Sequence, residues 1–444
     1  MSRGTVNVIG AGLAGPLLAV LLARRGFGVT LFERREDPRQ APADTGRSIN
    51  LALAARGIRA LEHAGLMDSV RPLMIPMRGR MVHEPGGAAT LLPYGQREDE
   101  VIYSIGRAAL NRLLIGAAAR EPDVTLRFGE SCVSVSPARN TLAVRRAATT
   151  REVPLAPTFA TDGAASAVRS SLIAQGLAAV REESLDHDYK ELAMPPVRGH
   201  YALDPNALHV WPRRGFMLIA LPNTDGSFTA TLFLPREGAT SFAALGDEST
   251  VESFFAREFP DARALVPDLA RQFREHPQGR LGTVHTSPWH IGGELLLLAD
   301  AAHAIVPFHG QGMNAAFEDC RVLDELIERY ESWAARFAAF EMERRPNADA
   351  IARMAIENYG EMREAVLEPR FLRQKAWALE LERRFPERFI PRYSMVMFHP
   401  EIDYAEALRR GAVQQEILDA LEKCGRGSNE LDVDSARKLI EARL

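Results

Sequence analysis

The sequence contains only three cysteines, Cys132, Cys320 and Cys424, and they are widely spaced. A disulfide-bonded scaffold has a higher density of cysteines, so this spacing favours free thiols in a reducing compartment. The first residues, MSRGTVNVIG, lack the charged region, the apolar core and the cleavage site of a signal peptide. We therefore expect a cytoplasmic protein.

Long apolar runs, repeats and a strong net charge are also absent. No segment approaches the roughly 18 consecutive apolar residues of a membrane span, and the chain has no internal repeat or low-complexity tract. The formal net charge of −4 gives no reason to expect a nucleic-acid partner. With 444 residues, of which 46% are hydrophobic and 25% charged, the composition indicates a soluble globular protein with two or three domains.

A glycine-rich motif near the start of the chain lies between a predicted strand and a predicted helix. The β-branched run Thr5–Ile9 favours a strand, and residues 10–15 form a GxGxxG motif before a helix expected over Pro16–Arg25. A second strand over Val29–Phe32 ends at Glu33. This order, with an acidic residue about 20 positions after the motif, is typical of a dinucleotide-binding Rossmann unit.

Each key residue of this unit has an expected task. Gly10 and Gly12 allow the tight turn and the close approach of a pyrophosphate, and Gly15 allows the helix to pack closely on the strand. Glu33 can accept hydrogen bonds from both hydroxyls of an adenosine ribose, and it would repel a 2′-phosphate. The unit should therefore bind the ADP half of FAD or NAD. The alternative is that the glycines serve only a tight turn.

A second candidate ligand site lies far along the chain. Leu295–Leu298 predicts a short buried strand, and Asp300 follows it, where a carboxylate is poorly placed for packing and well placed for a ligand hydroxyl. Pro307 and the glycines after it break regular structure before a helix expected from Asn314. The start of that helix offers free N–H groups and a positive dipole end to a group that gains negative charge, such as a reduced flavin. An ordinary strand–loop–helix connection is the alternative.

The two candidate sites together favour FAD over NAD. An NAD dehydrogenase needs no second nucleotide strand far along the chain, whereas the longer FAD needs a second anchor for its ribityl–isoalloxazine end. Asp300 and the turn over residues 310–314 supply such an anchor. We therefore expect one FAD that is held at both ends.

Three motifs resemble the flavin motifs of the single-component FAD-dependent aromatic hydroxylases. They are the N-terminal glycine motif, Asp162-Gly163 with Ser166, Val168 and Arg169, and Asp300–His303 with Pro307. Eight further stretches resemble the kynurenine 3-monooxygenases within this family: GRSINLAL (46–53), MRGRMVH (77–83), PYG (93–95), DYKEL (188–192), FMLIALPN (216–223), PFHGQGMN (307–314), ENYGEMR (357–363) and FIPRYSMV (389–396). Because these stretches extend to about residue 400, the resemblance covers nearly the whole chain.

The resemblance implies an α/β fold with three parts. An FAD-binding Rossmann-like domain of the aromatic-hydroxylase type is expected over residues 1–75, 100–180 and 281–345, and an antiparallel-sheet substrate domain over 76–99 and 181–280. A C-terminal helical region is expected over 346–444. The predicted strands of the substrate domain are Leu208–Trp211, Phe216–Leu221 and Phe228–Phe233, with a hairpin-like turn at residues 222–226, and the C-terminal helices are Arg353–Glu364 and Glu368–Arg384.

The resemblance also implies the residues at the flavin. The cofactor-binding residues are Gly10, Gly12, Leu13, Ala14, Gly15, Glu33, Arg34, Arg47, Arg107, Cys132, Asp300, Pro307, Gly310, Gly312, Met313 and Asn314. Arg107, at the start of a helix expected over residues 107–120, reaches the phosphate side of the flavin or is a surface charge. Phe308 and His309 are the expected catalytic residues at the ring pocket. For His309, proton delivery to the leaving hydroxide and a packing role both stay open, and His303 is expected to be a structural hydrogen-bond partner.

A pair of arginines marks the candidate substrate site. Arg78 and Arg80 are two residues apart, so in a strand they share one face and need an anion between them. That anion is a substrate carboxylate, or else it is Glu84 or Glu100. By resemblance, the residues that hold the amino-acid end of the substrate are Arg80, Tyr94, Asn358 and Tyr393. The planar fork of an arginine matches a carboxylate, whereas the Asn358 amide has another side chain as its alternative partner.

The activity implied is the hydroxylation of L-kynurenine to 3-hydroxykynurenine in tryptophan degradation. FAD is the cofactor, NADPH the electron donor and O₂ the co-substrate, and the reaction proceeds through a flavin C4a-hydroperoxide. A hydroxylase of another aromatic carboxylate and a flavin-binding protein without hydroxylating activity are the alternatives. No metal site is expected, the charged C-terminal segment lacks the membrane anchor of eukaryotic relatives, and the oligomeric state, a homodimer included, stays open.

Three positions depart from glycines of the family. They are Ala160, Asp188 and Ala299. Where the family glycine has a positive φ or a close backbone contact, the substitution costs on the order of 1 kcal/mol or more. We therefore expect somewhat weakened retention of FAD.

Overall fold

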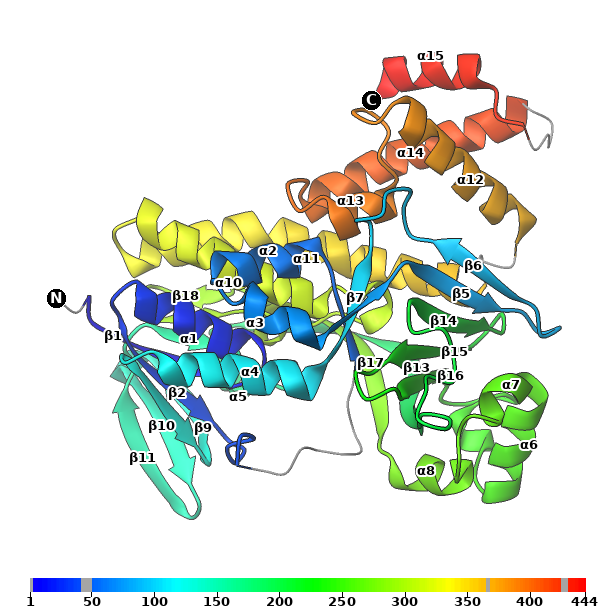
Figure 1. Cartoon of the computed structure of the whole chain (residues 1–444). Coiled ribbons are helices and arrows are strands. Elements are labelled where there is room, and N and C mark those ends of the chain that lie inside the picture. Colours follow the sequence, from blue (N-terminus) through cyan, green and yellow to red (C-terminus); the bar gives the residue numbers. More distant parts are fainter. Residues whose placement is uncertain (1–2, 41–49, 365–367, 425–429) are drawn as a thin grey trace. The chain divides into compact units, whose positions relative to one another are not determined.

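The computed structural model describes residues 3–40, 50–364, 368–424 and 430–444 (Figure 1). The chain divides into two compact units. Unit 1 comprises Met1–Met74, Ile105–Ser184 and Gly282–Ala352, and unit 2 comprises Ile75–Ser104, Leu185–Leu281 and Arg353–Leu444. Each unit is therefore discontinuous in sequence. The C-terminal helices belong to unit 2, together with the strands predicted for the substrate domain.

Unit 1 is built on a six-stranded sheet with the order β18-β19-β12-β1-β2-β8. The strands are β1 (Thr5–Ile9), β2 (Gly28–Glu33), β8 (Val124–Phe128), β12 (Thr158–Ala160), β18 (His290–Ile291) and β19 (Leu295–Leu297). All neighbours are parallel except β18 and β19. The last four residues of β1 and all of β19 are buried, which is the near-continuous apolar pattern of a parallel sheet covered on both faces.

Helices and two small sheets complete unit 1. The helices are α1 (Ala14–Arg24), α2 (Ala55–His63), α3 (Met67–Val70), α4 (Arg107–Arg120), α5 (Ala167–Ala174), α9 (Asp300–His303) and α10 (Gly312–Arg329). Helix α1 is apolar around most of its circumference because it packs against both α4 and α10. One small sheet joins β9 (Glu130–Ser136), β10 (Thr141–Arg146) and β11 (Thr149–Pro154), and the other joins β3 (Asn50–Leu53), β4 (Met74–Met77) and β7 (Ile102–Gly106), of which β4 and β7 continue into unit 2.

Unit 2 is built on a seven-stranded sheet with the order β17-β13-β16-β15-β14-β5-β6. The strands are β5 (Gly79–His83), β6 (Ala89–Pro93), β13 (Ala179–Met194), β14 (Ala207–Pro212), β15 (Met217–Pro222), β16 (Phe228–Pro235) and β17 (Gln278–Ser287). β15 and β16 form the hairpin that the sequence predicts, with Pro222 paired to Phe228. Helices α6 (Glu248–Glu258), α7 (Pro260–Arg263) and α8 (Leu269–Glu275) cover the sheet through a core rich in phenylalanine.

The C-terminal part of the chain is helical. Its helices are α11 (Trp333–Arg363), α12 (Pro369–Arg384), α13 (Arg392–Phe398), α14 (Tyr404–Cys424) and α15 (Val433–Arg443). The helix predicted to start at Arg353 in fact starts at Trp333 and continues through Pro346, because loss of one backbone hydrogen bond does not end a helix that is otherwise packed. A shared apolar cluster, which includes Trp377, Ile417 and Ile440, joins α12, α14 and α15. None of the helices in the described ranges combines the length and the hydropathy needed to cross a membrane.

Candidate functional site

The carboxyl ends of four strands meet at one edge of the parallel sheet in unit 1. Ile9 pairs with Phe32 on one side and with Ala160 on the other, and Ala160 pairs with Leu297. Neighbouring strands lie about 4.8 Å apart, so the ends of β1 and β19 are separated by roughly 10 Å. The glycine turn after β1 and the Asp300 segment after β19 therefore lie at one edge, where open α/β sheets bind dinucleotides. The structure thus brings together the two segments that the sequence assigns to one FAD.

The glycine turn excludes side chains at two of its positions. Gly10 has a φ of +102°, and a Cβ on it would lie 2.7 Å from the Thr161 carbonyl oxygen. A Cβ on Gly15 would lie 1.9 Å from the Gly10 carbonyl oxygen, whereas a Cβ on Gly12 would meet no described atom within 4 Å. The turn is therefore open at Gly12, on the side where a pyrophosphate approaches such a motif. Asn111 of α4, which sequence reasoning missed, fixes the turn by donating to the Gly12 carbonyl oxygen at 2.5 Å.

Glu33 presents a buried carboxylate beside this turn. Its Oε2 atom accepts a hydrogen bond from the Ala11 N–H group (2.7 Å), and its Oε1 atom accepts from the backbone N–H (2.9 Å) and the Nε (2.8 Å) of Arg35. Burial raises the pKa of Glu33, but the hydrogen bonds from Arg35 and Ala11 lower it more, so the pKa lies below its usual value. Glu33 is therefore a carboxylate anion at the end of β2. In this state it can accept hydrogen bonds from the hydroxyl groups of a ribose.

Asp162 and Arg169, two residues of the second flavin motif, tie β12 to the Asp300 segment. Asp162 accepts hydrogen bonds from the Ser166 hydroxyl (2.6 Å) and the Ala167 N–H group (2.8 Å) at the start of α5. Arg169 of the same helix donates from Nη1 to the Ala301 carbonyl oxygen at 2.8 Å. The motif therefore has a structural role, because it fixes the position of α9 relative to the end of β12.

Asp300 is the first residue of α9. Burial raises the pKa of Asp300, and this effect exceeds the opposing electrostatic influence of His303 and Arg107. Arg107, the exposed first residue of α4, thus lies near enough to act on Asp300 electrostatically. Among the described residues, none donates a hydrogen bond to the Asp300 carboxylate. A shielded carboxylate without an internal donor suits a ligand hydroxyl.

The residues on either side of Asp300 are held by Asp319 of α10. The Asp319 Oδ2 atom accepts from the Ala299 N–H group at 3.1 Å and lies 2.7 Å from His303 Nε2. His303 is therefore a structural hydrogen-bond partner, as the sequence predicts.

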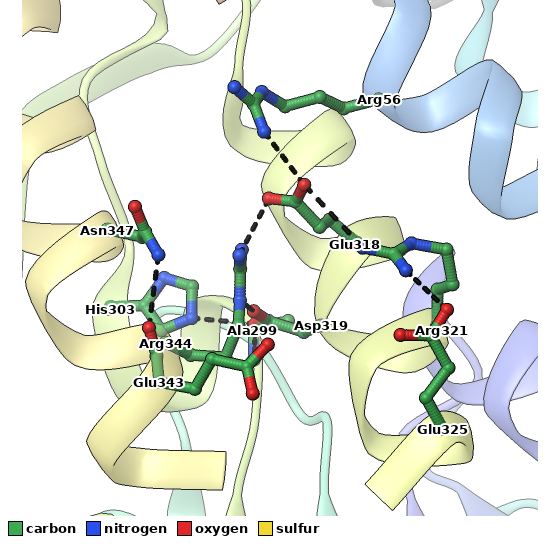
Figure 2. Close-up of polar contacts among 10 residues, drawn as sticks. All are labelled: Arg56, Ala299, His303, Glu318, Asp319, Arg321, Glu325, Glu343, Arg344 and Asn347. Carbon is green, nitrogen blue, oxygen red and sulfur yellow. Dashed lines mark hydrogen bonds and ion pairs between the residues drawn. The ribbon is translucent and has the colours of Figure 1, made fainter. Parts of the chain in front are cut away.

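Asp319 belongs to a larger network of buried charges within unit 1 (Figure 2). Arg344 of α11 donates to both Asp319 and Glu318, at 2.7 Å each, and Glu318 also accepts from Arg56 of α2 at 2.8 Å. Burial raises the pKa of Glu318, but the charges of Arg344 and Arg56 lower it more, so its pKa is lowered. The network therefore consists of ions that neutralise one another, and it locks α2, α9, α10 and α11 together.

The turn before α10 is fixed by Asn314. Its Oδ1 atom accepts from the Ala54 N–H group, and its Nδ2 atom donates to the carbonyl oxygens of Ala52 and Gly310, all at 2.9 Å. The side chain of Asn314 is thus used inside the protein, and only its backbone is available to face a cofactor. Helix α10 begins at Gly312, two residues before the predicted start, so the glycine turn forms the first turn of the helix.

The remaining predicted flavin residues lie in different environments. Leu13 and Ala14 start α1, Pro307, Phe308 and His309 form a short 3₁₀ turn before Gly310, Met313 is buried at the start of α10, and Arg34 is exposed after β2. Burial, together with the nearby Asp162 charge, raises the pKa of Cys132 to about 12, so Cys132 is a neutral thiol. Arg47 lies outside the described residues.

In unit 2, the four predicted substrate residues converge from distant parts of the chain. Arg80 lies in β5, Tyr94 directly after β6, Asn358 in α11 and Tyr393 in α13. The Arg80 guanidinium carbon is 5.0 Å from the ring centroid of Tyr393 and 5.9 Å from that of Tyr94, and the two tyrosine rings stack at 5.4 Å. Arg80 also donates from Nη2 to Asn358 Oδ1 at 3.2 Å. These residues therefore form one cluster, which we call the arginine–tyrosine cluster.

The expectation that Arg78 and Arg80 share one face of a strand is wrong. Strand β5 begins only at Gly79, so the alternation does not extend to Arg78, which is exposed, whereas Arg80 is 4% exposed. The carboxylate that pairs with Arg80 is Glu361, at 2.9 Å, and not Glu84 or Glu100.

Two charged residues of this cluster were missed by sequence reasoning. Glu361 follows Asn358 by one helical turn, a spacing that could have indicated it, whereas Lys375 of α12 gave no signal. Burial and the positive charge of Arg80 lower the pKa of Lys375 to about 8, against the opposing effect of Glu361. Burial also lowers the pKa of Arg80, but Tyr393 and Glu361 raise it more, so Arg80 is a permanent cation. With two cations and one carboxylate, the cluster has the charge to bind an anion.

Two polar atoms of the arginine–tyrosine cluster have no hydrogen-bond partner among the described residues. They are Arg80 Nε and the Tyr94 hydroxyl oxygen, and both are buried. Burial raises the pKa of Tyr94, so its hydroxyl keeps its proton and can donate. Unused buried donors are unfavourable in an isolated protein and favourable where a ligand completes them.

Of the three residues that replace family glycines, only Ala299 adopts a backbone conformation that favours glycine. It has a φ of +56° and a ψ of −140°. Ala160 lies in the regular strand β12, and Asp188 lies in β13, where it accepts hydrogen bonds from Arg236 (3.1 Å) and Gln278 (2.7 Å). The predicted conformational cost therefore applies at one position of the three.

Comparison with known proteins identifies the family. The model of the FAD binding domain family matches residues 3–355. A kynurenine 3-monooxygenase of Myxococcus xanthus (strain DK1622) is 46% identical over 445 residues, which cover 100% of this chain and 96% of the relative. A second, from Stenotrophomonas maltophilia (strain K279a), is 44% identical over 443 residues, or 99% of this chain and 97% of the relative.

Solved structures show the same fold at low sequence identity. The tetrameric form of 2-methyl-3-hydroxypyridine-5-carboxylic acid oxygenase has a TM-score of 0.67 at 18% identity, covering 86% of this chain and 98% of that one. HpxO of Klebsiella pneumoniae, in its complex with FAD and uric acid, has a TM-score of 0.65 at 20% identity, covering 87% and 94%. The chain therefore belongs to the family of FAD-dependent monooxygenases that includes these kynurenine 3-monooxygenases.

Proposed function

We propose that this protein hydroxylates L-kynurenine at C3 to give 3-hydroxykynurenine, with NADPH as the electron donor and O₂ as the oxygen source. The observation that carries the proposal is the arginine–tyrosine cluster, in which Arg80, Tyr94, Asn358 and Tyr393 converge within unit 2. The full-length similarity to enzymes named kynurenine 3-monooxygenase supports the identity of the substrate.

The cluster has the chemistry for the amino-acid end of kynurenine. Arg80 supplies a permanent positive charge and an unused Nε donor, and Tyr94 supplies a hydroxyl donor, so both suit a carboxylate. Lys375 adds a second cation, and Glu361 provides a carboxylate that suits the ammonium group of the same substrate. A zwitterion is thus matched by charges of both signs.

The edge of the parallel sheet in unit 1 fits FAD. The open turn at Gly12 suits the pyrophosphate, Glu33 the adenosine ribose, and Asp300 a hydroxyl of the ribityl chain. FAD held there would supply the chemistry by which electrons from NADPH activate O₂ for transfer of one oxygen atom to the ring. Because the ring is already activated ortho to its amino group, the tasks of the protein are to orient the substrate and to exclude water. We assign Phe308 and His309, both buried beside the start of α10, to the ring pocket.

The decisive assay mixes purified protein with FAD, NADPH and kynurenine in air. We expect 3-hydroxykynurenine to form with one NADPH oxidised per product. NADPH oxidation that yields only peroxide would favour a hydroxylase of another aromatic carboxylate. Absence of any substrate-dependent NADPH oxidation would favour a flavin-binding protein without hydroxylating activity.

We further propose that the protein works in the cytoplasm. The support is that Cys132 and Cys320, the two cysteines with described side chains, are buried free thiols. A homodimer remains a prediction, and light scattering of the purified protein during gel filtration tests it.

A further inference from the structure

Unit 2 contains a second cluster of polar side chains that the proposed reaction does not use. Glu100 lies in the segment between β6 and β7, Glu382 lies near the end of α12, and His399 directly follows α13. One ligand atom of each residue lies within 4.8 Å of those of the other two. Three distant segments therefore deliver two carboxylates and one imidazole to one point, which we call the Glu–Glu–His cluster.

Each carboxylate of this cluster is oriented by hydrogen bonds to one of its oxygen atoms. Glu100 Oε2 accepts from the backbone N–H groups of Gln96 (2.6 Å) and Arg97 (3.0 Å). Glu382 Oε2 accepts from the side-chain amide of Gln96 at 3.0 Å. Glu382 Oε1 is buried and accepts no hydrogen bond from the described part of the chain. Glu100 Oε1 is also buried, and it forms an ion pair with the half-exposed side chain of Arg97. Each carboxylate is thus oriented through its Oε2 atom. Glu382 Oε1 is left for a ligand, and Glu100 Oε1 is left for a ligand that displaces Arg97.

His399 is arranged in the same way. Its Nδ1 atom lies 2.8 Å from the carboxylate of Glu401, so Nδ1 is the donor and the lone pair lies on Nε2. The Nε2 atom is buried and has no hydrogen-bond partner among the described residues. Histidines that ligate a metal usually donate their other N–H group to a carboxylate, which fixes the tautomer.

The cluster carries an excess of negative charge. Glu382 is 4% exposed. Arg97 pairs with Glu100 Oε1, but its side chain is half exposed and can turn into water. A buried group of this charge is costly unless a cation neutralises it.

We propose that Glu100, Glu382 and His399 bind one divalent transition-metal ion of the Zn²⁺ or Mn²⁺ class, with water completing the coordination. One imidazole nitrogen and two carboxylate oxygens suit these ions, whereas Mg²⁺ and Ca²⁺ prefer oxygen alone. The ion cross-links the segment after β6, which carries Tyr94, to α12 and to α13, which carries Tyr393. The proposal does not depend on the proposed activity.

The test uses the full-length protein after treatment with EDTA and removal of the chelator. Zn²⁺, Mn²⁺ and Mg²⁺ are titrated separately by calorimetry, and thermal unfolding is followed with and without each ion. We expect one equivalent of Zn²⁺ or Mn²⁺ to bind and to raise the unfolding midpoint, because an ion that binds only the folded chain stabilises it. Mg²⁺ should bind at least tenfold more weakly.

Variants separate this site from binding elsewhere on the surface. Glu382→Gln replaces the carboxylate by a neutral amide, and His399→Asn removes the imidazole nitrogen, so each change should weaken binding at least tenfold. Glu98→Gln, an exposed change in the same segment, should leave the affinity unchanged, and Arg97→Ala should increase it by removing the competing cation. If Glu382→Gln fails to fold, His399→Asn decides the question. Absence of one-site binding by the wild-type protein, or wild-type affinity in the ligand variants, would overturn the proposal.

Discussion

Asp319 accepts hydrogen bonds from the backbone N–H group of Ala299 at 3.1 Å and from His303 at 2.7 Å (Figure 2). The two donors flank Asp300, which we assign to the flavin. Ala299 has a φ of +56°, a conformation that a residue with a Cβ atom adopts only at a cost. The buried network around Asp319 therefore holds Ala299 in a backbone conformation that an alanine disfavours. Strained backbone conformations of this kind are common beside functional residues.

Replacing Ala299 by glycine removes this cost. We expect Ala299→Gly to increase the free energy of unfolding by about 1 kcal/mol and to strengthen FAD binding severalfold, since the turn no longer opposes its bound conformation. Denaturant unfolding and FAD titration followed by flavin fluorescence measure the two effects. The matched control is Ala160→Gly, which lies in regular strand and should lower the free energy of unfolding by roughly 0.5–1 kcal/mol. Equal effects of the two changes would contradict the assignment of strain to Ala299.

The shape of the Arg80 guanidinium should matter as much as its charge. Arg80→Lys keeps the positive charge but loses the planar arrangement of donors. We expect KM for kynurenine to rise at least tenfold, corresponding to roughly 1.5–3 kcal/mol for a hydrogen bond to a charged group. Steady-state kinetics measure this, with Arg78→Lys as the control, because Arg78 is exposed and should tolerate the change. A similar KM in both variants would rule out Arg80 as the carboxylate ligand.

Lys375 should make substrate binding depend on pH. Its pKa is lowered to about 8, first by burial and then by the charge of Arg80, so it is a cation below pH 8 and neutral above. KM for kynurenine should therefore rise between pH 7 and pH 9.5. In Lys375→Met we expect a KM that is about fivefold higher at pH 7, corresponding to about 1 kcal/mol, and a flatter dependence on pH.

The control for this experiment is Lys438→Met, an exposed lysine in α15. Its KM and its pH dependence should match the wild-type protein. An unchanged pH profile in Lys375→Met would assign the pH dependence to the substrate and not to Lys375.

A histidine pair in unit 2 should limit stability in acid. His209 Nε2 lies 2.9 Å from the Asp204 carbonyl oxygen, and its Nδ1 atom lies 2.9 Å from His83 Nε2. Since a carbonyl only accepts, His209 donates from Nε2 and accepts at Nδ1 from His83. A second proton on His209 would face the donor of His83. Burial lowers the pKa of His209 to about 4, against the opposing hydrogen bond to the Asp204 carbonyl group, and the neighbouring His83 lowers it further.

The sign of the effect follows from proton uptake. The folded pKa of about 4 is below the value of 6.5 that the residue has when unfolded, so the unfolded chain takes up this proton first as the pH falls. The free energy of unfolding is therefore highest above pH 6.5. It decreases by on the order of 3 kcal/mol as the pH falls to 4. Urea unfolding at pH 7 and pH 4.5, followed by tryptophan fluorescence, should show a smaller acid loss in His209→Asn than in wild type. The exposed control His200→Asn should behave as wild type.

The sequence alone determined the Rossmann unit and the nature of its ligand. The strand that ends at Ile9, the glycine motif and Glu33 lie within one short segment. The strand–turn–helix–strand unit can therefore be predicted from neighbouring residues alone. The hairpin between β15 and β16 followed from turn chemistry for the same reason. Resemblance to a family identified Arg80, Tyr94, Asn358 and Tyr393, but no spacing in the sequence relates these residues to one another.

Only the tertiary structure decided which of these residues are neighbours and which charges pair. Arg80 pairs with Glu361, 281 positions away, and not with the acidic residues near it in sequence. The side chain of Asn314 forms hydrogen bonds with the backbone of Ala52 and Ala54. Glu100, Glu382 and His399 lie close together although no metal-ligand spacing in the sequence links them. Periodicity and motif spacing report contacts within a few turns of chain. Contacts between remote segments depend on how whole elements pack, and for that reason the buried charge networks became visible only in three dimensions.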